Sequence, residues 1–208
     1  MFENTDSLIF DLDGTLWNAS AVVAKGVQTA TKEAGYTHKI TADDISSLAG
    51  LPHDEVYRKL FPDLSNEQRA ELMEKCAKAE IDFLEAEGGQ LYDKLEETLR
   101  YLHGKYKLFI VSNCQDGYIE IFLHYHQLQR YFDGHACYGA AGKPKADNIK
   151  AVVKDNGLQS AIYIGDTKGD YDASQKAGLP FIFARYGFGQ VEADVASIDS
   201  FSDLQEIF

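Results

Sequence analysis

Two aspartates spaced two residues apart carry the clearest chemical signal in the sequence. Asp11 and Asp13 follow the apolar run 8–10 and precede Gly14, which permits a sharp turn. Where a chain leaves a strand in this way, one carboxylate can attack an electrophile while the other carries protons. An isolated Asp-x-Asp-Gly is more often a turn that closes a strand. An EF-hand calcium loop is excluded because its glycine comes later in the loop.

A hydroxyl, an amide and a lysine could hold a phosphoryl group. Ser112 and Asn113 follow the apolar run 107–111, and their side chains can bind phosphoryl oxygens without adding charge. Lys143 lies in Gly-Lys-Pro before a predicted helix and could neutralise phosphate charge. Taken singly, the first pair is typical of a turn and the lysine is typical of a solvated surface.

Two more carboxylates follow a later apolar run. Asp166 and Asp170 lie in Gly-Asp-Thr-Lys-Gly-Asp, directly after residues 161–164. Carboxylate oxygens are the ligands that hard cations prefer, so this pair could bind a metal ion. The structural alternative is a cap at the N-terminus of the following helix.

The elements that must position these residues alternate along the chain. Apolar runs rich in β-branched and aromatic residues predict buried strands at 8–10, 107–111, 161–164 and 181–184. Helical spacing of apolar residues predicts helices at 91–103, 146–156 and 171–177. The alternation predicts an α/β fold, a Rossmann-like parallel sheet with helices on both faces. Ligands bind beyond the carboxyl ends of such strands, so the polar residues should converge there.

Residues 17–87 interrupt this alternation. Four amphipathic helices without a strand between them are predicted at 19–34, 43–49, 54–61 and 66–87. Gly88 and Gly89 mark the return of the chain to the sheet. We therefore expect two domains: an α/β core of residues 1–16 and 88–208, and an inserted α-helical cap of residues 17–87.

The polar segments occur in the order of a known set of motifs. The sequence resembles the haloacid dehalogenase-like hydrolase superfamily, whose four motifs match Asp11-x-Asp13-Gly14-Thr15, Ser112, Lys143 and Gly165-Asp166-x-x-x-Asp170. The resemblance covers nearly the whole chain, and the insertion looks like the helical cap of that superfamily. The segments 91–93, 112–113, 142–144 and 185–189 are most similar to its phosphoglycolate phosphatase and β-phosphoglucomutase branch. Related folds host many functions, so the motifs leave the substrate open.

The resemblance implies a role for each of these residues. Asp11 would form an aspartyl-phosphate, and Asp13 would protonate the leaving oxygen and then activate water. The residues that would bind the transferring phosphate are Ser112, Asn113 and Lys143.

The resemblance also implies Mg²⁺ as the cofactor. Its ligands would be Asp11, the backbone carbonyl of Asp13, and Asp166, while Asp170 would act through water or by orienting the ligands. Four carboxylates and one lysine leave three net negative charges, and a divalent cation reduces these to one. With Asp13 protonated, as a general acid must be, the site is neutral before the substrate binds.

Substrate selection is expected to lie in the cap. The turn at Gly50 could reach over the site together with His53, and Trp17 and Arg58 lie nearby in the sequence. Each has a structural alternative, because Trp17 can pack inside the cap and Arg58 can lie on a solvated helix face.

Composition restricts the partners and the compartment. The 208 residues carry a net charge of −13, which argues against nucleic acid or an anionic membrane as the main partner. Three cysteines without a paired spacing favour reduced thiols. The sequence shows no signal peptide pattern and no apolar run long enough to span a bilayer. We therefore expect a cytoplasmic monomer or homodimer whose partner is a small phosphorylated metabolite.

Magnesium-dependent hydrolysis of a small phosphomonoester, phosphoglycolate-like or a sugar phosphate, is the favoured function. A phosphomutase of the β-phosphoglucomutase type stays open as an alternative. A non-catalytic regulatory protein on the same fold would be expected to lack an acidic motif, and none is missing. Haloacid dehalogenation is disfavoured, because that branch lacks the carboxylate that Asp13 supplies here.

Overall fold

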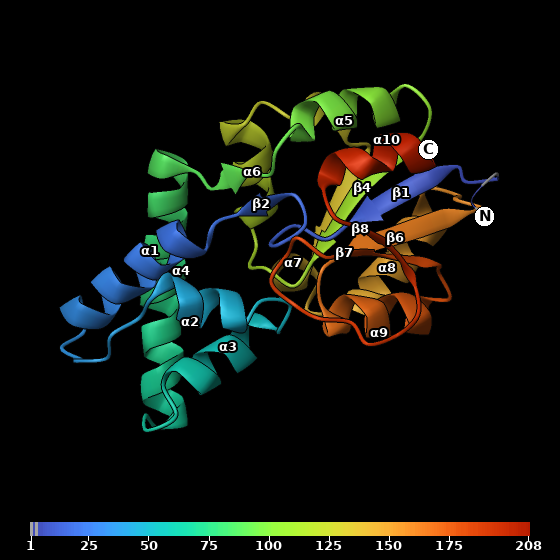
Figure 1. Cartoon of the computed structure of the whole chain (residues 1–208). Coiled ribbons are helices and arrows are strands. Elements are labelled where there is room, and N and C mark those ends of the chain that lie inside the picture. Colours follow the sequence, from blue (N-terminus) through green and yellow to red (C-terminus); the bar gives the residue numbers. More distant parts are fainter. Residues whose placement is uncertain (1, 3) are drawn as a thin grey trace.

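A six-stranded parallel sheet forms the centre of the molecule (Figure 1). The computed structural model describes residue 2 and residues 4–208. The strand order is β5-β4-β1-β6-β7-β8, and every neighbouring pair is parallel. The strands are β1 (Ser7–Phe10), β4 (Lys107–Ser112), β5 (Gly134–Cys137), β6 (Ala161–Gly165), β7 (Phe181–Ala184) and β8 (Ala196–Ile198).

Helices cover both faces of this sheet. One face carries α5 (Leu95–His103), α6 (Tyr118–Tyr125) and α10 (Leu204–Ile207), and the other carries α8 (Lys145–Asp155) and α9 (Lys168–Ala177). Side chains alternate across a strand, so Leu8 and Phe10 pack in the first hydrophobic core while Ile9 packs in the second. The predicted α/β fold with helices on both faces is confirmed.

Four helices lie between the first two motifs and form a separate lobe beside the sheet (Figure 1). They are α1 (Ser20–Glu33), α2 (Ala42–Ser47), α3 (His53–Leu60) and α4 (Asn66–Glu87). Ser65 and Gln68 form a capping box that starts α4. Helices α1 and α4 approach closely at Gly26, where an added Cβ would lie 2.9 Å from the backbone of Glu80.

A short two-stranded ribbon joins this lobe to the core. The chain leaves through β2 (Trp17–Asn18) and returns through β3 (Gln90–Leu91), which pair antiparallel. The division into a core of 1–16 and 88–208 and a cap of 17–87 stays a prediction. We refer to α1–α4 and their connecting loops as the cap.

The sequence pattern does not predict helix α6, the edge strands β5 and β8, or the ribbon strands β2 and β3. Strand β5 reads Gly-His-Ala-Cys and lies at the sheet edge, where little apolar burial is required. Strand β8 lies at the other edge. The remaining short elements are α7 (Tyr138–Ala141) and 3₁₀ turns at Gln129–Tyr131 and Phe201–Asp203. Within the described part of the chain, no helix is both long enough and apolar enough to cross a membrane.

Candidate active site

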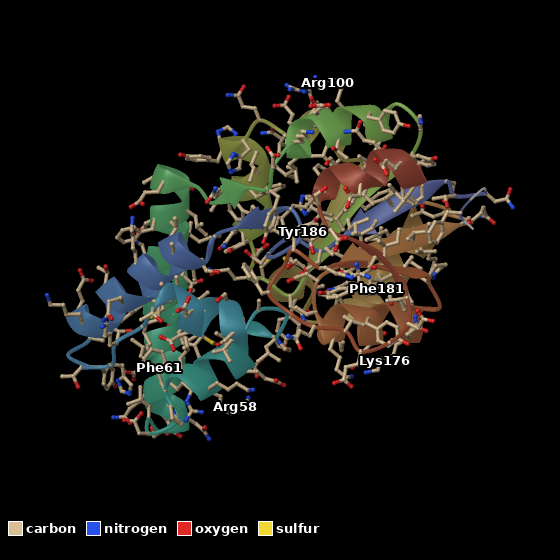
Figure 2. The ribbon with its side chains drawn as sticks, viewed as in Figure 1. Arg58, Phe61, Arg100, Lys176, Phe181 and Tyr186 are labelled. Atoms are coloured by element: carbon tan, nitrogen blue, oxygen red, sulfur yellow. The ribbon has the colours of Figure 1, made fainter. Side chains whose placement is uncertain are left out.

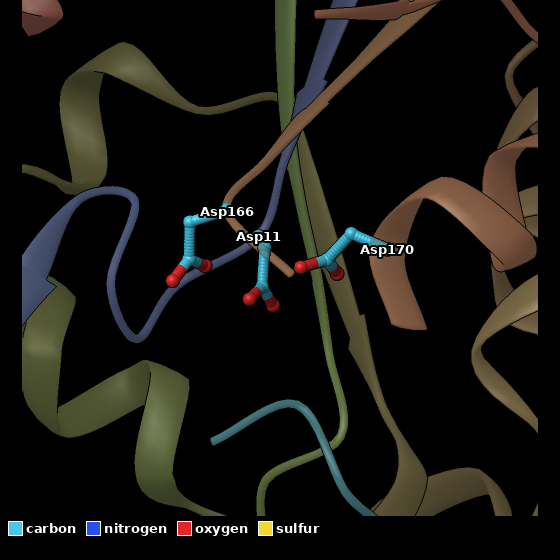
Figure 3. A group of neighbouring side chains, drawn as sticks. All are labelled: Asp11, Asp166 and Asp170. Carbon is cyan, nitrogen blue, oxygen red and sulfur yellow. The ribbon is translucent and has the colours of Figure 1, made fainter. Parts of the chain in front are cut away.

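Three buried carboxylates meet at the carboxyl edge of the sheet (Figure 3). Asp11 follows β1, Asp166 follows β6, and Asp170 lies in the first turn of α9. One oxygen from each lies within 4.8 Å of the others, and each residue is at most 2 % exposed. Strand β1 lies between β4 and β6, the position where ligands bind in sheets of this type. A cluster of hard oxygen donors fits a divalent cation such as Mg²⁺.

Hydrogen bonds and close backbone packing hold Asp166 in place. Its Oδ1 accepts a hydrogen bond from Thr15 Oγ1 at 3.2 Å, and its Oδ2 accepts one from the Phe188 backbone N–H at 2.7 Å. Gly14 has φ +85°, and an added Cβ would collide with the Asp166 carboxylate. Glycine is therefore required at position 14 both for the turn and for the space that the carboxylate occupies.

The two carboxylate oxygens of Asp170 accept hydrogen bonds from different parts of the structure, one from the N-terminus of α9 and the other from residues of the site. Its Oδ2 accepts hydrogen bonds from the backbone N–H and the hydroxyl of Thr167, which is the N-cap of α9. Its Oδ1 accepts a hydrogen bond from Lys145 at 2.6 Å and another from the Tyr163 hydroxyl at 3.3 Å. The Asp170 carboxylate therefore does both things that the sequence leaves open: it helps to cap α9, and it lies at the site.

Lys145, and not Lys143, is the lysine of the site. Lys145 Nζ donates to Asp11 Oδ1 at 2.8 Å and to Asp170 Oδ1 at 2.6 Å, and its side chain is only 4 % exposed. Lys143 is exposed and precedes α8, so its predicted placement is wrong. Lys145, Ile149 and Val152 share the buried face of α8 at helical spacing, and this face is directed at the sheet. That periodicity was the available signal for the correct lysine.

Asp13 is held by two aromatic side chains. Its Oδ1 accepts hydrogen bonds from Trp17 Nε1 at 3.0 Å and from the Tyr118 hydroxyl at 2.9 Å. Burial and the neighbouring charge of Asp11 raise the pKa of Asp13 to about 7. A carboxyl that is protonated near neutral pH can act as a general acid. The predicted binding of metal by its backbone carbonyl stays a prediction.

Burial also raises the proton affinity of the other carboxylates. The pKa of Asp11 rises to about 6 through burial and the charge of Asp170, although Lys145 opposes the shift. Burial and the charges of Asp170 and Asp11 raise the pKa of Asp166 well above its usual range. For Lys145, burial lowers the pKa, but the two carboxylates outweigh it and the pKa rises. A bound cation would favour the ionised carboxylates.

A cavity of about 100 Å³ lies between the cap and the carboxyl edge of the sheet. Ser112 and Asn113 lie in its wall beside Asp11, as predicted, and the cap contributes Gly50 and His53. Asn113 Nδ2 donates to the Gly50 carbonyl at 2.8 Å, which joins the cap to the core. The cavity therefore has reactive carboxylates on its core side and cap residues on the other.

Two predicted specificity residues lie elsewhere. Trp17 is fully buried and donates to Asp13, so it positions a site carboxyl from outside the cavity wall. Arg58 lies on the outer surface of α3, where it pairs with Asp54 at 3.0 Å (Figure 2). The spacing of the two on α3 favours this exposed pair. Neither Trp17 nor Arg58 lines the cavity, so their positions do not support the prediction that they contact the substrate.

Replacing Gly50 with alanine should impair closure of the cap. Gly50 has φ +81°, and an added Cβ would lie 2.7 Å from Thr167 Oγ1. We expect kcat/KM for p-nitrophenyl phosphate to fall about tenfold or more, because small displacements of a closing loop are costly. Gly35→Ala is the matched control, since Gly35 has φ +85° with nothing within 4 Å of an added Cβ. Equal kinetic losses in both variants would show that backbone strain, and not the contact with Thr167, is responsible.

Sequence reasoning also missed Tyr118, Gln115 and Glu80. Tyr118 and Gln115 lie in the segment after β4, and Glu80 is a buried residue of α4 in the cap. Glu80 lies on the same helical face as Cys76 and Leu84, so its burial could be read from helical spacing. Its direction toward the cavity depends on how the cap packs on the core, and local sequence carries no signal for that.

Known proteins are similar to this chain in sequence and architecture. A phosphoglycolate phosphatase from Aliivibrio fischeri is 29% identical over 205 residues, covering 92% of this chain and 89% of that protein. The pyrophosphatase PpaX of Listeria monocytogenes is 29% identical over 178 residues, covering 82% of this chain and 79% of that protein. The structure of a predicted phosphoglycolate phosphatase from Haemophilus somnus superposes with a TM-score of 0.86 at 19% identity, covering 98% and 97% of the two chains.

The family comparison agrees with the order of the motifs and the geometry of the site. The model for haloacid dehalogenase-like hydrolases matches residues 8–184, which include the four carboxylates, Ser112 and Lys145. A match of this extent covers the sheet through β7 and all four cap helices. The chain is therefore a member of the haloacid dehalogenase-like hydrolase family.

Proposed function

We propose that this protein is a magnesium-dependent phosphatase that hydrolyses a small phosphomonoester through an aspartyl-phosphate on Asp11. The observation that carries the proposal is the buried arrangement of Asp11 beside Lys145, Asp166 and Asp170. Asp11 of this group lines the cavity between the cap and the core, together with Asp13. The phosphatase names of the relatives and the family membership support the same reaction class.

The residues of the site divide the reaction between them. The Asp11 carboxylate attacks phosphorus, and Asp13 gives its proton to the leaving oxygen. Asp13 then takes a proton from the water that hydrolyses the intermediate. Its raised pKa of about 7 suits both steps at neutral pH. Trp17 and Tyr118 hold the Asp13 carboxyl in one orientation by donating to Oδ1.

Three uncharged or positive groups would hold the transferring phosphoryl group. Ser112 and Asn113 line the cavity, and the groups that can donate to phosphoryl oxygens are the Ser112 hydroxyl and the second N–H of the Asn113 amide, whose first N–H donates to Gly50. Lys145 compensates the charges of Asp11 and Asp170 and keeps Asp11 oriented. Stabilising charge and fixing in-line geometry supply most of the catalysis in phosphoryl transfer.

The three carboxylates at the edge of the sheet would hold Mg²⁺. Their oxygens lie within 4.8 Å of one another, and hard oxygen ligands suit this ion. When bound, Mg²⁺ would neutralise charge on the phosphate oxygens. The hydrogen bonds from Thr15 and Phe188 fix the orientation of Asp166 for this role.

Chelation and an isosteric substitution test the metal-dependent reaction. We expect EDTA to abolish release of p-nitrophenol from p-nitrophenyl phosphate and Mg²⁺ to restore it. Asp166→Asn should raise the Mg²⁺ concentration for half-maximal rate by about tenfold or more. Asp172→Asn is the control, since Asp172 lies on α9, six residues after Asp166, and pairs with Lys168 at the surface. Full activity of Asp166→Asn without added metal would contradict the metal role.

A panel of phosphorylated metabolites assayed with Mg²⁺ separates the candidate substrates. Phosphoglycolate-like compounds and sugar phosphates are both proposed, and formation of an isomer in place of free phosphate would favour the mutase alternative.

The three cysteines are free thiols, which supports the proposed location in the cytoplasm. Monomeric and homodimeric states both fit this proposal.

A further inference from the structure

A buried carboxylate of the cap forms part of the cavity wall opposite the reacting aspartates. Glu80 is 4 % exposed and lines the cavity together with Asp11 and Asp13. Its Oε1 accepts a hydrogen bond from the Tyr57 hydroxyl at 2.6 Å, and its Oε2 accepts one from Gln115 Nε2 at 2.8 Å. Gln115 belongs to the core, so Glu80 is fixed where the cap meets the core.

Two buried polar atoms of residues that line this cavity have no hydrogen-bond partner. His53 Nε2 is buried and lies 3.6 Å from Glu80 Oε2, too far for a hydrogen bond. Asn113 Oδ1 is also buried and unpaired, while its Nδ2 donates to Gly50. Both residues line the cavity. Unpaired buried polar atoms are costly, and a bound hydroxyl group could satisfy both of them.

The charges of the cavity wall are unfavourable for a second anion. Its carboxylates are Asp11, Asp13 and Glu80, and no arginine or lysine lines it among residues 2 and 4–208. Lys145 does not line the cavity, and its ammonium group already donates hydrogen bonds to Asp11 and Asp170. A carboxylate or second phosphate on the leaving group would therefore be desolvated beside Glu80 without a fixed cation.

Glu80 is already compensated by polar neighbours. Tyr57 and Gln115 donate to its two oxygens, and His53 lies beside it. The rest of the wall is mostly apolar and includes Val27 and Leu51. An ammonium group on the leaving group would lose its hydration when it enters this cavity. In return it would gain a contact with only one carboxylate, Glu80, which is already hydrogen-bonded.

We propose that the substrate is a phosphomonoester of a small uncharged alcohol that carries hydroxyl groups, and that Glu80, His53 and Asn113 select it. This inference rests on the proposed phosphatase function. His53 Nε2 and Asn113 Oδ1 bind a hydroxyl of the alcohol, and Glu80 rejects alcohols that carry a negative charge. Phosphomonoesters of small polyols and sugars belong to this class, and phosphoglycolate does not.

The first test compares three phosphomonoesters that differ in the charge of the alcohol. With Mg²⁺, kcat/KM should be highest for glycerol 3-phosphate and about tenfold or more lower for both phosphoglycolate and phosphoethanolamine. A preference for phosphoglycolate or for phosphoethanolamine would overturn the inference. Hydrolysis of p-nitrophenyl phosphate is measured in parallel, because its absence would contradict the phosphatase function itself and not only the substrate class.

The second test removes the charge of Glu80 with little change in shape. In Glu80→Gln, the ratio of kcat/KM for phosphoglycolate to that for glycerol 3-phosphate should rise about tenfold over the native ratio. Any uniform loss of activity cancels in this ratio. Glu74→Gln is the matched control, since Glu74 is exposed on the same helix and should leave the ratio unchanged. An unchanged ratio in Glu80→Gln would contradict selection by charge.

His53→Phe provides an independent test that does not depend on the stability of the Glu80 variant. Phenylalanine keeps the edge contact that the His53 ring makes with Tyr57 at 4.9 Å between centroids. We expect KM for glycerol 3-phosphate to rise about tenfold, because the hydroxyl loses its partner. KM for p-nitrophenyl phosphate, whose leaving group has no hydroxyl to bind there, should rise by a clearly smaller factor. Equal changes for the two substrates would contradict the assigned hydroxyl contact.

Discussion

Asp11→Asn should lose at least about 10⁴-fold in kcat for p-nitrophenyl phosphate, since removal of a nucleophile is among the costliest single changes in an enzyme. Asparagine has nearly the same shape, and its side-chain oxygen can still accept the hydrogen bond that Lys145 donates to Asp11. The fold should therefore persist while the reaction stops. Release of p-nitrophenol with saturating Mg²⁺ measures the loss.

The matched control for this variant is Asp155→Asn. Asp155 is an exposed residue at the end of α8, outside the four motifs. Its variant should keep native activity. Circular dichroism and thermal unfolding of Asp11→Asn should show a folded protein. Native activity in Asp11→Asn would exclude Asp11 as the nucleophile.

Lys145→Ala should lose about 10²- to 10³-fold in kcat, while Lys143→Ala should keep native activity. Lys145 donates to Asp11 and Asp170 from a buried position, and Lys143 is exposed two residues earlier. The two variants carry the same substitution within one short segment. Comparable losses in both would contradict the placement of Lys145, and a loss confined to Lys143→Ala would restore the sequence-based assignment.

The same substitution should also destabilise the metal-free protein. Without Lys145, the buried carboxylates of Asp11 and Asp170 face each other with no cation between them and Asp166. Leaving buried charges without their partner costs about 3–5 kcal/mol. Urea unfolding in EDTA should show this loss for Lys145→Ala, and added Mg²⁺ should recover part of it by binding the folded state. An unchanged unfolding midpoint in EDTA would contradict this account of the pair.

The sheet and its reactive edge follow from local patterns that the sequence displays directly. Buried central strands such as β1, β4 and β6 are continuous apolar runs, so their carboxyl ends and the residues that follow can be located. The placements predicted for Asp11, Ser112 and Asp166 at one edge are found in the structure. Edge strands β5 and β8 bury less and lack this pattern.

The prediction of Lys143 rested on Gly-Lys-Pro and did not consider Lys145, which lies at a helix boundary. Proline at 144 is the N-cap of α8, and Lys145 is the first helical residue. The prediction began this helix one residue later, at 146, which left Lys145 outside the helical face that packs on the sheet. Starting the periodicity at 145 aligns it with Ile149 and Val152. Helix ends are the least certain part of a prediction from sequence spacing.

The role of Glu80 in the cap could not be assigned from the sequence because it depends on tertiary packing. Trp17 donates to a carboxyl four residues away, while Arg58 pairs with Asp54 on the outer surface of its helix. Glu80 reaches the cavity only because α4 packs against α1 at Gly26 and meets Gln115 of the core. The Glu80 contact with Gln115 joins segments that are distant in the chain, so helical spacing alone does not encode it. The Arg58–Asp54 pair is local, and its spacing on α3 could be read from the sequence.

Chemical trapping of the intermediate tests the central claim most directly. Borohydride reduces an acyl-phosphate to an alcohol, so an aspartyl-phosphate formed during turnover becomes homoserine at the same position. Native enzyme quenched during steady-state turnover with Mg²⁺ should contain homoserine at position 11 by peptide mass spectrometry, and Asp11→Asn should contain none. Homoserine at position 13 or at another aspartate, or turnover without any trapped residue, would contradict the assignment of Asp11 as the phosphate acceptor.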